Sequence, residues 1–238
     1  MSGSDSAGPA RGPNPREPGG DWSAVDARMR AEWDARAREH ARRYINDREY
    51  EGFDFLLSGC RDAFEVVGPL HERMRHDMHM VEIGCGIGRM LPFFAMLFEQ
   101  VHGVDVAPGM VEEGRRVLAH LPNVTFHLGN GRSLTGLDDA SCDLAISFQV
   151  FQHIPDKGVI RDYVADAFRV LKPGGLARFM VKQRPWAGQP AEPDTWNGVD
   201  ILRADIDQWA QDNPWVVESV TDFLDPTRAW VLLRKPGS

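Results

Sequence analysis

The sequence is poor in several features that mark common classes of protein. Its 238 residues include three cysteines, Cys60, Cys85 and Cys142, which are far apart and odd in number. We therefore expect neither a disulfide framework nor a zinc or other metal site. No apolar run approaches the length of a membrane-spanning helix, about eighteen residues, and there is no signal-peptide pattern. We expect a cytoplasmic protein that does not bind a membrane.

Positive charge is also scarce. Lys and Arg together number 27 against 35 Asp and Glu, which gives a formal net charge of −8 at pH 7. The phosphate backbone of a nucleic acid would be repelled unless a local basic patch offset this charge, and the sequence shows no obvious patch. The charge balance therefore argues against a nucleic-acid partner. The sequence leaves the oligomeric state open between a monomer and a homodimer.

What the sequence does contain is a glycine-rich turn between an apolar strand and a helix. Residues 78–83 form a short apolar run that predicts a buried strand, and Gly84, Gly86 and Gly88 follow in alternation. Glycines at such a turn let the backbone bend sharply and let a ligand approach the main chain. The amides at the start of the next helix add partial positive charge. This stretch predicts a site for a nucleotide-like ligand.

The spacing narrows the choice of nucleotide. A dinucleotide fingerprint needs G-x-G-x-x-G, but Arg89 stands at its third position, which disfavours a nicotinamide oxidoreductase. About seventeen residues beyond Gly88, a second short strand (101–104) ends at Asp105, whose carboxylate could accept both ribose hydroxyls of an adenosine. The alternative is an Asp that caps the next helix. Together with the glycine pattern, we favour the ribose role.

Five segments, taken in order, resemble the class I S-adenosylmethionine-dependent methyltransferases that modify small molecules. The segments correspond to the family's first three motifs, the strand that leads to the methyl-transfer site and the turn into strand five; they are residues 82–88, 103–105, 126–131, 142–147 and 170–175. The third departs from the family pattern, because Asn130 stands where Asp is usual. An amide oxygen can still accept a hydrogen bond from the adenine amino group.

Strands and helices alternate through the same region, which predicts a doubly wound parallel α/β sheet. The expected strands are residues 78–83, 101–104, 124–128, 144–148 and 176–182, with helices between them, the first at 90–98. Two last strands, 215–220 and 229–233, are joined by a link too short for a parallel crossover. The resemblance implies a Rossmann-like seven-stranded sheet, mostly parallel with an antiparallel C-terminal strand.

The domain organisation follows from composition. Residues 1–21 are rich in Gly, Pro and Ser and predict a disordered tail. Residues 22–75 form an N-terminal helical cap, and residues 76–238 form the S-adenosylmethionine-binding methyltransferase domain. The cap comprises two helices, 23–48 and 53–74. We place on the buried side of the second helix the residues Leu56, Leu57, Cys60, Phe64, Val67 and Leu70.

A long loop at residues 184–199 should emerge at the ligand-binding edge of the sheet. We favour a wall facing the substrate over a purely structural excursion. Four aromatic residues could line an apolar pocket there: Trp33, Phe151, Trp186 and Trp196.

The resemblance also implies which residues form the site. Tyr44 could touch the carboxylate of the cofactor, although packing of the helix is the alternative. Gln149 is placed to meet the cofactor after strand four. The cofactor-binding residues implied are Tyr44, Glu82, Gly84, Cys85, Gly86, Gly88, Asp105, Val106, Met110, Asn130, Gly131 and Gln149.

His153 is the candidate catalytic residue. A hydroxyl acceptor must lose its proton during methyl transfer, and a histidine near neutral pKa suits this task. The alternative is a histidine that shapes the turn by bonding to backbone; His127 and Asp156 are weaker candidates. The resemblance implies transfer of a methyl group from S-adenosylmethionine, by in-line displacement, to O, N or C of a small metabolite. A regulatory protein that binds the cofactor without turnover is the alternative.

Overall fold

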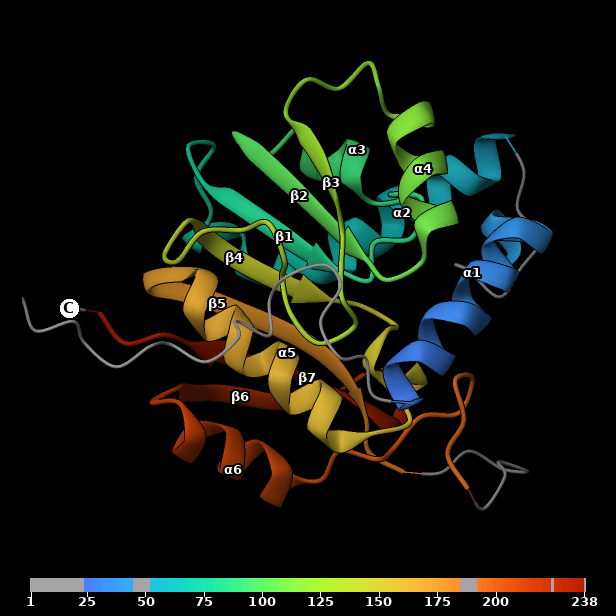
Figure 1. The fold of residues 1–238 in the computed structure, drawn as a ribbon. Helices are drawn as coiled ribbons and strands as arrows, with labels where there is room; N and C mark the ends of the chain where they lie inside the picture. Colours follow the sequence, from blue (N-terminus) through green and yellow to red (C-terminus); the bar gives the residue numbers. More distant parts are fainter. Residues whose placement is uncertain (1–23, 45–51, 185–191, 224, 238) are drawn as a thin grey trace, which may run out of the picture.

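The computed structural model describes residues 24–44, 52–184, 192–223 and 225–237 (Figure 1). Its strands are β1 (His79–Ile83), β2 (Gln100–Asp105), β3 (Val124–Leu128), β4 (Cys142–Ser147), β5 (Leu171–Lys182), β6 (Val216–Phe223) and β7 (Asp225–Arg234). Its helices are α1 (Ala24–Tyr44), α2 (Gly52–Val67), α3 (Leu91–Phe94), α4 (Pro108–Val117), α5 (Lys157–Val170) and α6 (Arg203–Asp212), with 3₁₀ turns η1 (Gly68–Arg73) and η2 (Phe151–His153). The predicted tail at 1–21 lies outside the described residues.

The described strands form one seven-stranded sheet in the order β3-β2-β1-β4-β5-β7-β6. β7 runs antiparallel to both β5 and β6, and the other neighbouring pairs are parallel. The predicted doubly wound sheet with an antiparallel C-terminal strand is confirmed. In this strand order the chain moves outward from β1 in both directions, so the ends of β1 and β4 mark the switch point where such sheets bind ligands.

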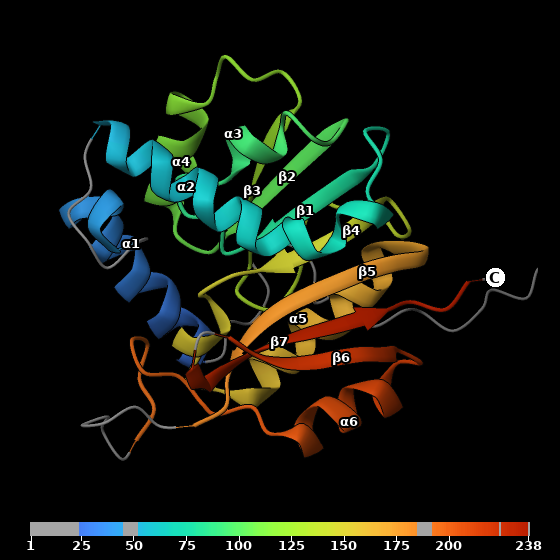
Figure 2. The same cartoon turned by 180° about the vertical axis from the view of Figure 1, so that it is seen from behind.

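Two apolar layers cover the sheet because successive side chains of a strand point to opposite faces. Met80 of β1 packs with residues of α2, α3 and α4, whereas Val81 and Ile83 pack with α5 and α6. Figures 1 and 2 show α2 and α5 on opposite faces of the sheet. None of the helices in the described ranges is both long and apolar enough to span a membrane.

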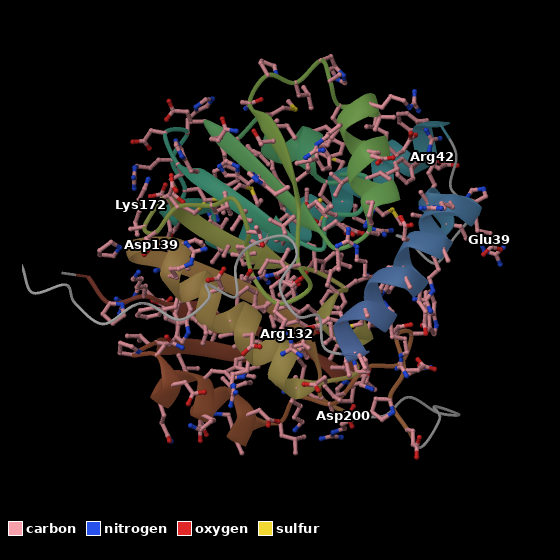
Figure 3. All side chains as sticks on the ribbon, in the orientation of Figure 1. Glu39, Arg42, Arg132, Asp139, Lys172 and Asp200 are labelled. Atoms are coloured by element: carbon pink, nitrogen blue, oxygen red, sulfur yellow. The ribbon has the colours of Figure 1, made fainter. Side chains whose placement is uncertain are left out.

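Helix α1 lies across the carboxyl ends of the strands (Figure 1), and its Met29 packs into the same layer as α5 and α6. Polar contacts attach it at three points. Asp34 accepts the Gly109 amide of α4 at 2.8 Å. Asp26 pairs with Arg132 at 2.5 Å, and Arg132 also pairs with Asp162 of α5 at 2.8 Å, so that its guanidinium joins α1 to α5 (Figure 3). At the third point Arg36 donates a hydrogen bond to the Thr195 hydroxyl at 3.0 Å.

The predicted inner face of the second helix is wrong. Leu56, Leu57, Cys60 and Phe64 are exposed, and α2 instead turns Ser58, Gly59 and Asp62 inward. The physical reason is that a Cβ on Gly59 would overlap the carbonyl oxygen of Arg89, so a glycine permits close approach there. Val67 and Leu70 are buried as expected.

Two predicted helices have different bounds in the structure. The α-helical part of the second helix ends at Val67, where Gly68 and Pro69 begin the 3₁₀ turn η1. The helix expected at 90–98 is the single turn α3, which contains Pro92.

Two histidines pair across the β2–β3 ladder, where Nδ1 of His102 lies 3.1 Å from Nε2 of His127. Burial and the neighbouring His127 and His79 lower the pKa of His102 from 6.5 to about 4. Burial and Arg115 also lower the pKa of His127. His127, a weaker candidate for catalysis in the sequence, therefore belongs to a structural pair.

This pair predicts an acid-sensitive fold. Below about pH 6.5 the unfolded chain binds a proton that the folded His102 ring takes up only near pH 4, so the free energy of unfolding should fall as the pH decreases through this window. The slope should stay below the about 1.4 kcal/mol per pH unit of one whole proton, because solvent reaches part of the His102 ring. Urea unfolding of His102→Gln should show a weaker pH dependence than the wild type. The matched variant of exposed His120, His120→Gln, should not; an equal dependence in all three proteins would contradict this assignment.

Candidate functional site

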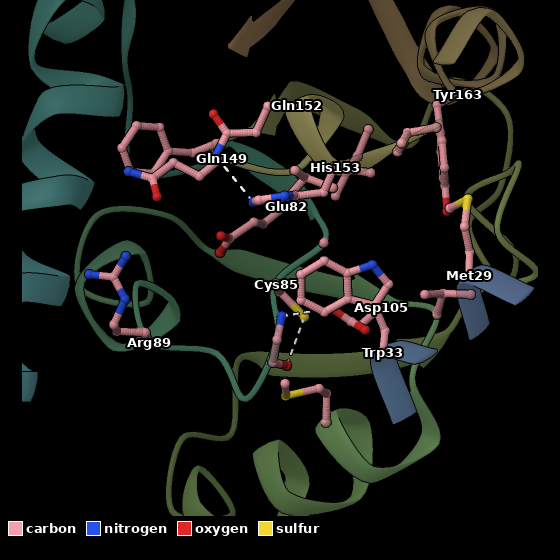
Figure 4. Close-up of a pocket in the computed structure, with 18 of the residues that line it drawn as sticks. Met29, Trp33, Glu82, Cys85, Arg89, Asp105, Gln149, Gln152, His153 and Tyr163 are labelled. Atoms are coloured by element: carbon pink, nitrogen blue, oxygen red, sulfur yellow. Dashed lines mark hydrogen bonds between the residues drawn. The ribbon is translucent and has the colours of Figure 1, made fainter. Parts of the chain in front are cut away.

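A cavity of about 370 Å³ opens at the carboxyl ends of β1, β2 and β4 (Figure 4). This volume lies within the range typical of small-molecule sites. Nine of the residues proposed from the sequence line it: Glu82, Gly84, Cys85, Gly86, Asp105, Val106, Met110, Gln149 and His153. The site is therefore built where the parallel strands end, as the strand order requires.

The glycine turn after β1 is held in a conformation that suits glycine. Gly84, Gly86 and Gly88 have left-handed φ angles of 74°, 55° and 82°. A Cβ on Gly84 would overlap Val150, and one on Gly88 would overlap Phe126. Gly88 does not line the cavity, so its part is to let the turn pack against the sheet, whereas Gly84 and Gly86 expose backbone to the cavity.

Asp105 ties the turn after β1 to the turn after β2. One carboxylate oxygen accepts the Gly86 amide at 2.8 Å, and the other accepts the Ala107 amide at 2.9 Å. Burial raises the pKa of Asp105, while these amides and that of Val106 act in the opposite direction. Each carboxylate oxygen has a second lone pair with which it can accept a donor from the cavity.

Glu82, at the end of β1, is the second carboxylate of the site. It is 3 % exposed, and its Oε2 atom has no hydrogen-bond partner among the described residues. Burial raises its pKa to about 8, with Arg89 lowering it and Asp105 raising it further. A buried carboxyl group with an unpartnered oxygen facing a cavity is suited to a ligand that brings a donor or a positive charge.

Arg89 reaches the cavity from behind the glycine turn. Its guanidinium donates to the Ser58 hydroxyl at 3.2 Å and to the Asp62 carboxylate at 2.8 Å. Both partners lie on the inner face of α2. In the sequence Arg89 was of interest only as the residue in place of a third glycine. Its partner Asp62 lies 27 residues earlier in the chain, so no local sequence pattern predicts that pairing.

His153, in turn η2, lines the same cavity as the two carboxylates. Its Nδ1 is 2.6 Å from the carbonyl oxygen of Trp196, and its Nε2 is 3.1 Å from the amide nitrogen of Gln152. A carbonyl can only accept, so Nδ1 carries the proton and Nε2 holds the lone pair in the neutral ring. Gln149, just before this turn, has a left-handed φ of 57°, which is uncommon for a residue with a side chain.

An aromatic cluster from three segments covers this side of the cavity. The rings of Trp33, His153 and Trp196 have centroids 5.1–6.3 Å apart. The Arg36 guanidinium lies 4.6 Å from the Trp33 ring and donates to the Thr195 hydroxyl at 3.0 Å. Helix α1 and the described end of the 184–199 loop thus form one wall, which supports the expected position of that loop.

Some predicted residues lie elsewhere. The side-chain oxygen of Asn130 accepts the amides of Arg132 and Ser133 at 2.9 and 2.8 Å, and neither Asn130 nor Gly131 lines the cavity. Asp156 caps helix α5 by accepting the Gly158 amide at 2.6 Å.

Of the four aromatic residues proposed for the pocket, Trp33 and Trp196 line it. Phe151 is instead fully buried against Tyr163 and Phe179. The side chain of Tyr44, all of Trp186 and residues 45–48 of the first helix lie outside the described residues.

Several residues that line the cavity were not proposed from the sequence: Met29, Arg89, Phe148, Gln152, Tyr163 and Arg228. Tyr163 is one of the buried residues of α5. Figure 4 shows it beside Met29, at the edge of the cavity. Arg228 is in β7, far from every motif. The positions of these residues are set by tertiary packing.

The fold is of the doubly wound α/β class, and the cavity lies at the carboxyl ends of the strands, where proteins of this class bind their ligands. A family model described as a methyltransferase domain matches residues 80–175. A probable S-adenosylmethionine-dependent methyltransferase of Mycolicibacterium smegmatis is 34% identical over 110 residues, 45% of this chain and 40% of that protein. The chain spans less than half the length of the curated relatives it matches.

Solved structures share the fold. The phosphoethanolamine N-methyltransferase 1 of Haemonchus contortus, solved with S-adenosylhomocysteine, has a TM-score of 0.67 at 15% identity, covering 92% of this chain and 50% of that one. The magnesium protoporphyrin IX methyltransferase of Synechocystis, with bound SAH, has a TM-score of 0.65 at 16% identity, covering 89% and 99%. Residues 80–175 thus match a methyltransferase domain, and the fold is shared with S-adenosylmethionine-dependent methyltransferases.

Asp105 gives the first test of the site. We expect Asp105→Ala to weaken binding of S-adenosylhomocysteine by about tenfold or more, because hydrogen bonds to a charged group contribute about 1.5–3 kcal/mol. Isothermal titration calorimetry would measure the dissociation constant. Asp105→Asn, which keeps an acceptor for one backbone amide, should lose less affinity and controls for collapse of the glycine turn. An unchanged dissociation constant in Asp105→Ala would refute the role of this carboxylate.

Proposed function

We propose that this chain transfers the methyl group of S-adenosylmethionine to an oxygen, nitrogen or carbon atom of a small acceptor by in-line displacement. The observation that carries the proposal is one cavity that brings two carboxylates and a histidine together. Glu82 and Asp105 lie at the ends of β1 and β2, and His153, whose tautomer is defined by the Trp196 carbonyl, lines the same cavity. The carboxylates suit the cofactor, and the histidine suits an acceptor that must lose a proton.

Glu82 and Asp105 are the residues that would hold the cofactor. The unpartnered Glu82 oxygen matches the ammonium of the methionine part, and Asp105 matches the two ribose hydroxyls. Gly84 and Gly86 allow the main chain to approach the ligand. When bound, S-adenosylmethionine supplies a methyl group already activated by a sulfonium. The protein's part is then alignment, exclusion of water and proton removal.

His153 is the proposed general base for an acceptor with an ionisable proton. With the proton on Nδ1, the Nε2 lone pair is the basic site, and the Gln152 amide holds it by a hydrogen bond. The Gln152 side-chain oxygen is buried without a partner among the described residues. If the amide rotates by half a turn, this oxygen can accept from a protonated Nε2. Gln152 is therefore a positioning residue that can satisfy both charge states of His153.

The aromatic cluster has the complementary task of excluding water. Trp33 from α1 and Trp196 from the loop meet over His153, and the Arg36–Thr195 contact holds their two segments together. Excluding water strengthens the electrostatic interactions inside the cavity. The two similar solved structures are named for small acceptors, phosphoethanolamine and magnesium protoporphyrin IX, which supports a small molecule as the acceptor here.

The proposed function predicts methylation that depends on His153. Incubation with S-adenosylmethionine labelled in the methyl group and a panel of phenols, amines and carboxylic acids should transfer label to an acceptor. For a hydroxyl acceptor, His153→Ala should lower kcat by about a hundredfold or more. The dissociation constant of S-adenosylhomocysteine should stay within a few-fold, which separates catalysis from folding.

The variant Gln152→Leu tests whether Gln152 positions His153. It should move the acidic limb of the pH–rate profile, since the partner of Nε2 is lost, and should spare cofactor binding. Full activity of His153→Ala would return this residue to a structural role. Cofactor binding without label transfer to any acceptor would favour the regulatory alternative.

Glu82 predicts a pH-dependent affinity. Because burial holds its pKa near 8, the group is mostly protonated at neutral pH, and a bound ammonium should displace that proton. The dissociation constant of S-adenosylhomocysteine should therefore fall by up to about tenfold per pH unit between about pH 6 and 7.5. Calorimetry in two buffers with different enthalpies of ionisation should detect about one released proton. Glu82→Gln should abolish that release; an equal release from the variant would contradict the assignment.

A further inference from the structure

Helix α2 carries a row of large apolar side chains on its outer face. Phe53, Leu56, Leu57 and Phe64 are 73%, 50%, 53% and 75% exposed, and Cys60, also exposed, lies among them. Their spacing of three and four residues places them on one side of the helix. These five residues are called the α2 stripe. Figure 2 shows α2 as the outermost element on its side of the sheet.

The inner face of α2 is fixed, so the helix cannot rotate to bury the stripe within its own subunit. Ser58 and Asp62 hold the Arg89 guanidinium, and Gly59 lies against the Arg89 carbonyl. The carbonyls of Glu65 and Val66 near the end of the helix accept hydrogen bonds from Arg178 of β5. These contacts join both halves of the helix to the domain and leave the stripe facing outward.

The exposed apolar area approaches that of a protein interface. Met96 and Leu97, in the segment after α3, which packs beside α2, are 75% and 46% exposed and extend the surface. At about 200 Å² for a large side chain, the exposed fractions of these two residues and of Phe53, Leu56, Leu57 and Phe64 add up to on the order of 700 Å². The largest apolar patch of a monomer is about 300–600 Å², and a standard interface takes about 800 Å² from each partner.

Charge and composition favour another copy of this chain as the occupant. α2 contains Asp54, Asp62 and Glu65 against one basic residue, Arg61, and the whole chain has a charge of −8, which disfavours an anionic lipid surface. Residues 1–21 contain one large apolar side chain, Met1, and so offer little to cover the stripe. A second α2 stripe supplies matching apolar side chains.

We propose that the chain forms a homodimer in which the α2 stripes of two subunits pack antiparallel about a two-fold axis at Cys60. Leu56 and Phe64 lie four residues before and after Cys60. An antiparallel pair centred there therefore places Leu56 of each subunit against Phe64 of the partner subunit. A two-fold interface requires such self-complementarity. The proposal concerns assembly and does not depend on the proposed enzymatic activity.

Analytical ultracentrifugation of the full chain at about 1–50 μM provides the test. We expect a mass of twice the 26.7 kDa of one chain. Leu57→Glu and Phe64→Glu should each shift the dimer toward the single-chain mass, with a dissociation constant raised at least tenfold. Both side chains are at least half exposed, so the subunit should stay folded, as circular dichroism and binding of S-adenosylhomocysteine would verify. Leu202→Glu changes a comparably exposed leucine immediately before α6 and should leave the dimer intact.

Cross-linking through Cys60 tests the position of the two-fold axis. A short bismaleimide should join two subunits through Cys60, since Cys85 and Cys142 are buried, and Cys60→Ala should abolish the product. The single-chain mass throughout, or a dimer unaffected by both glutamate variants, would overturn the proposal. A dimer that does not cross-link would overturn the axis at Cys60. A single-chain protein that sediments with phosphatidylcholine–phosphatidylglycerol vesicles would overturn it in favour of a lipid surface.

Discussion

The ligand-binding edge of this protein depends on one carboxylate that bonds to two turns. Asp105 ends β2, yet one of its oxygens accepts the Gly86 amide from the turn after β1. The amides of Gly84 and Cys85 also bond to the Val104 carbonyl in β2. The two turns therefore cannot move independently. Burial of the Asp105 charge is costly, and backbone amides offset part of that cost.

Sequence alone predicted the parts of the fold whose causes are local. The glycine turn, the buried strands and the antiparallel ending each follow from residues within a few positions of one another, and the structure places them as expected. The orientation of α2 was wrong because apolar spacing gave no weight to Gly59 and Asp62, which meet Arg89 across the fold. The contact between Asp62 and Arg89, which are 27 positions apart, produces no periodic pattern in the sequence.

The candidate site divides in the same way. Its cofactor side lies on the motifs, so eight of the proposed cofactor-binding residues line the cavity. Its other wall is assembled from α1, η2 and the loop at Trp196, which are distant in sequence. Asn130 shows the limit of matching by motif, since its side-chain oxygen serves its own turn. His153 was identified by position, but its tautomer is apparent only from the Trp196 carbonyl.

The attachment of α1 has a consequence for exchange of the cofactor. This helix covers the cavity through polar contacts, from Asp26 to Arg132, from Asp34 to Gly109 and from Arg36 to Thr195, and through apolar contacts of Met29 and Ala37. Among the polar contacts the Asp26–Arg132 ion pair responds most to dissolved ions, which screen charges over about 10 Å at 0.1 M but screen a buried carboxylate such as Asp26 less. Salt therefore weakens part of this attachment and leaves its apolar part in place. The residence time of the cofactor would shorten as salt rises, even where every residue that touches it is unchanged.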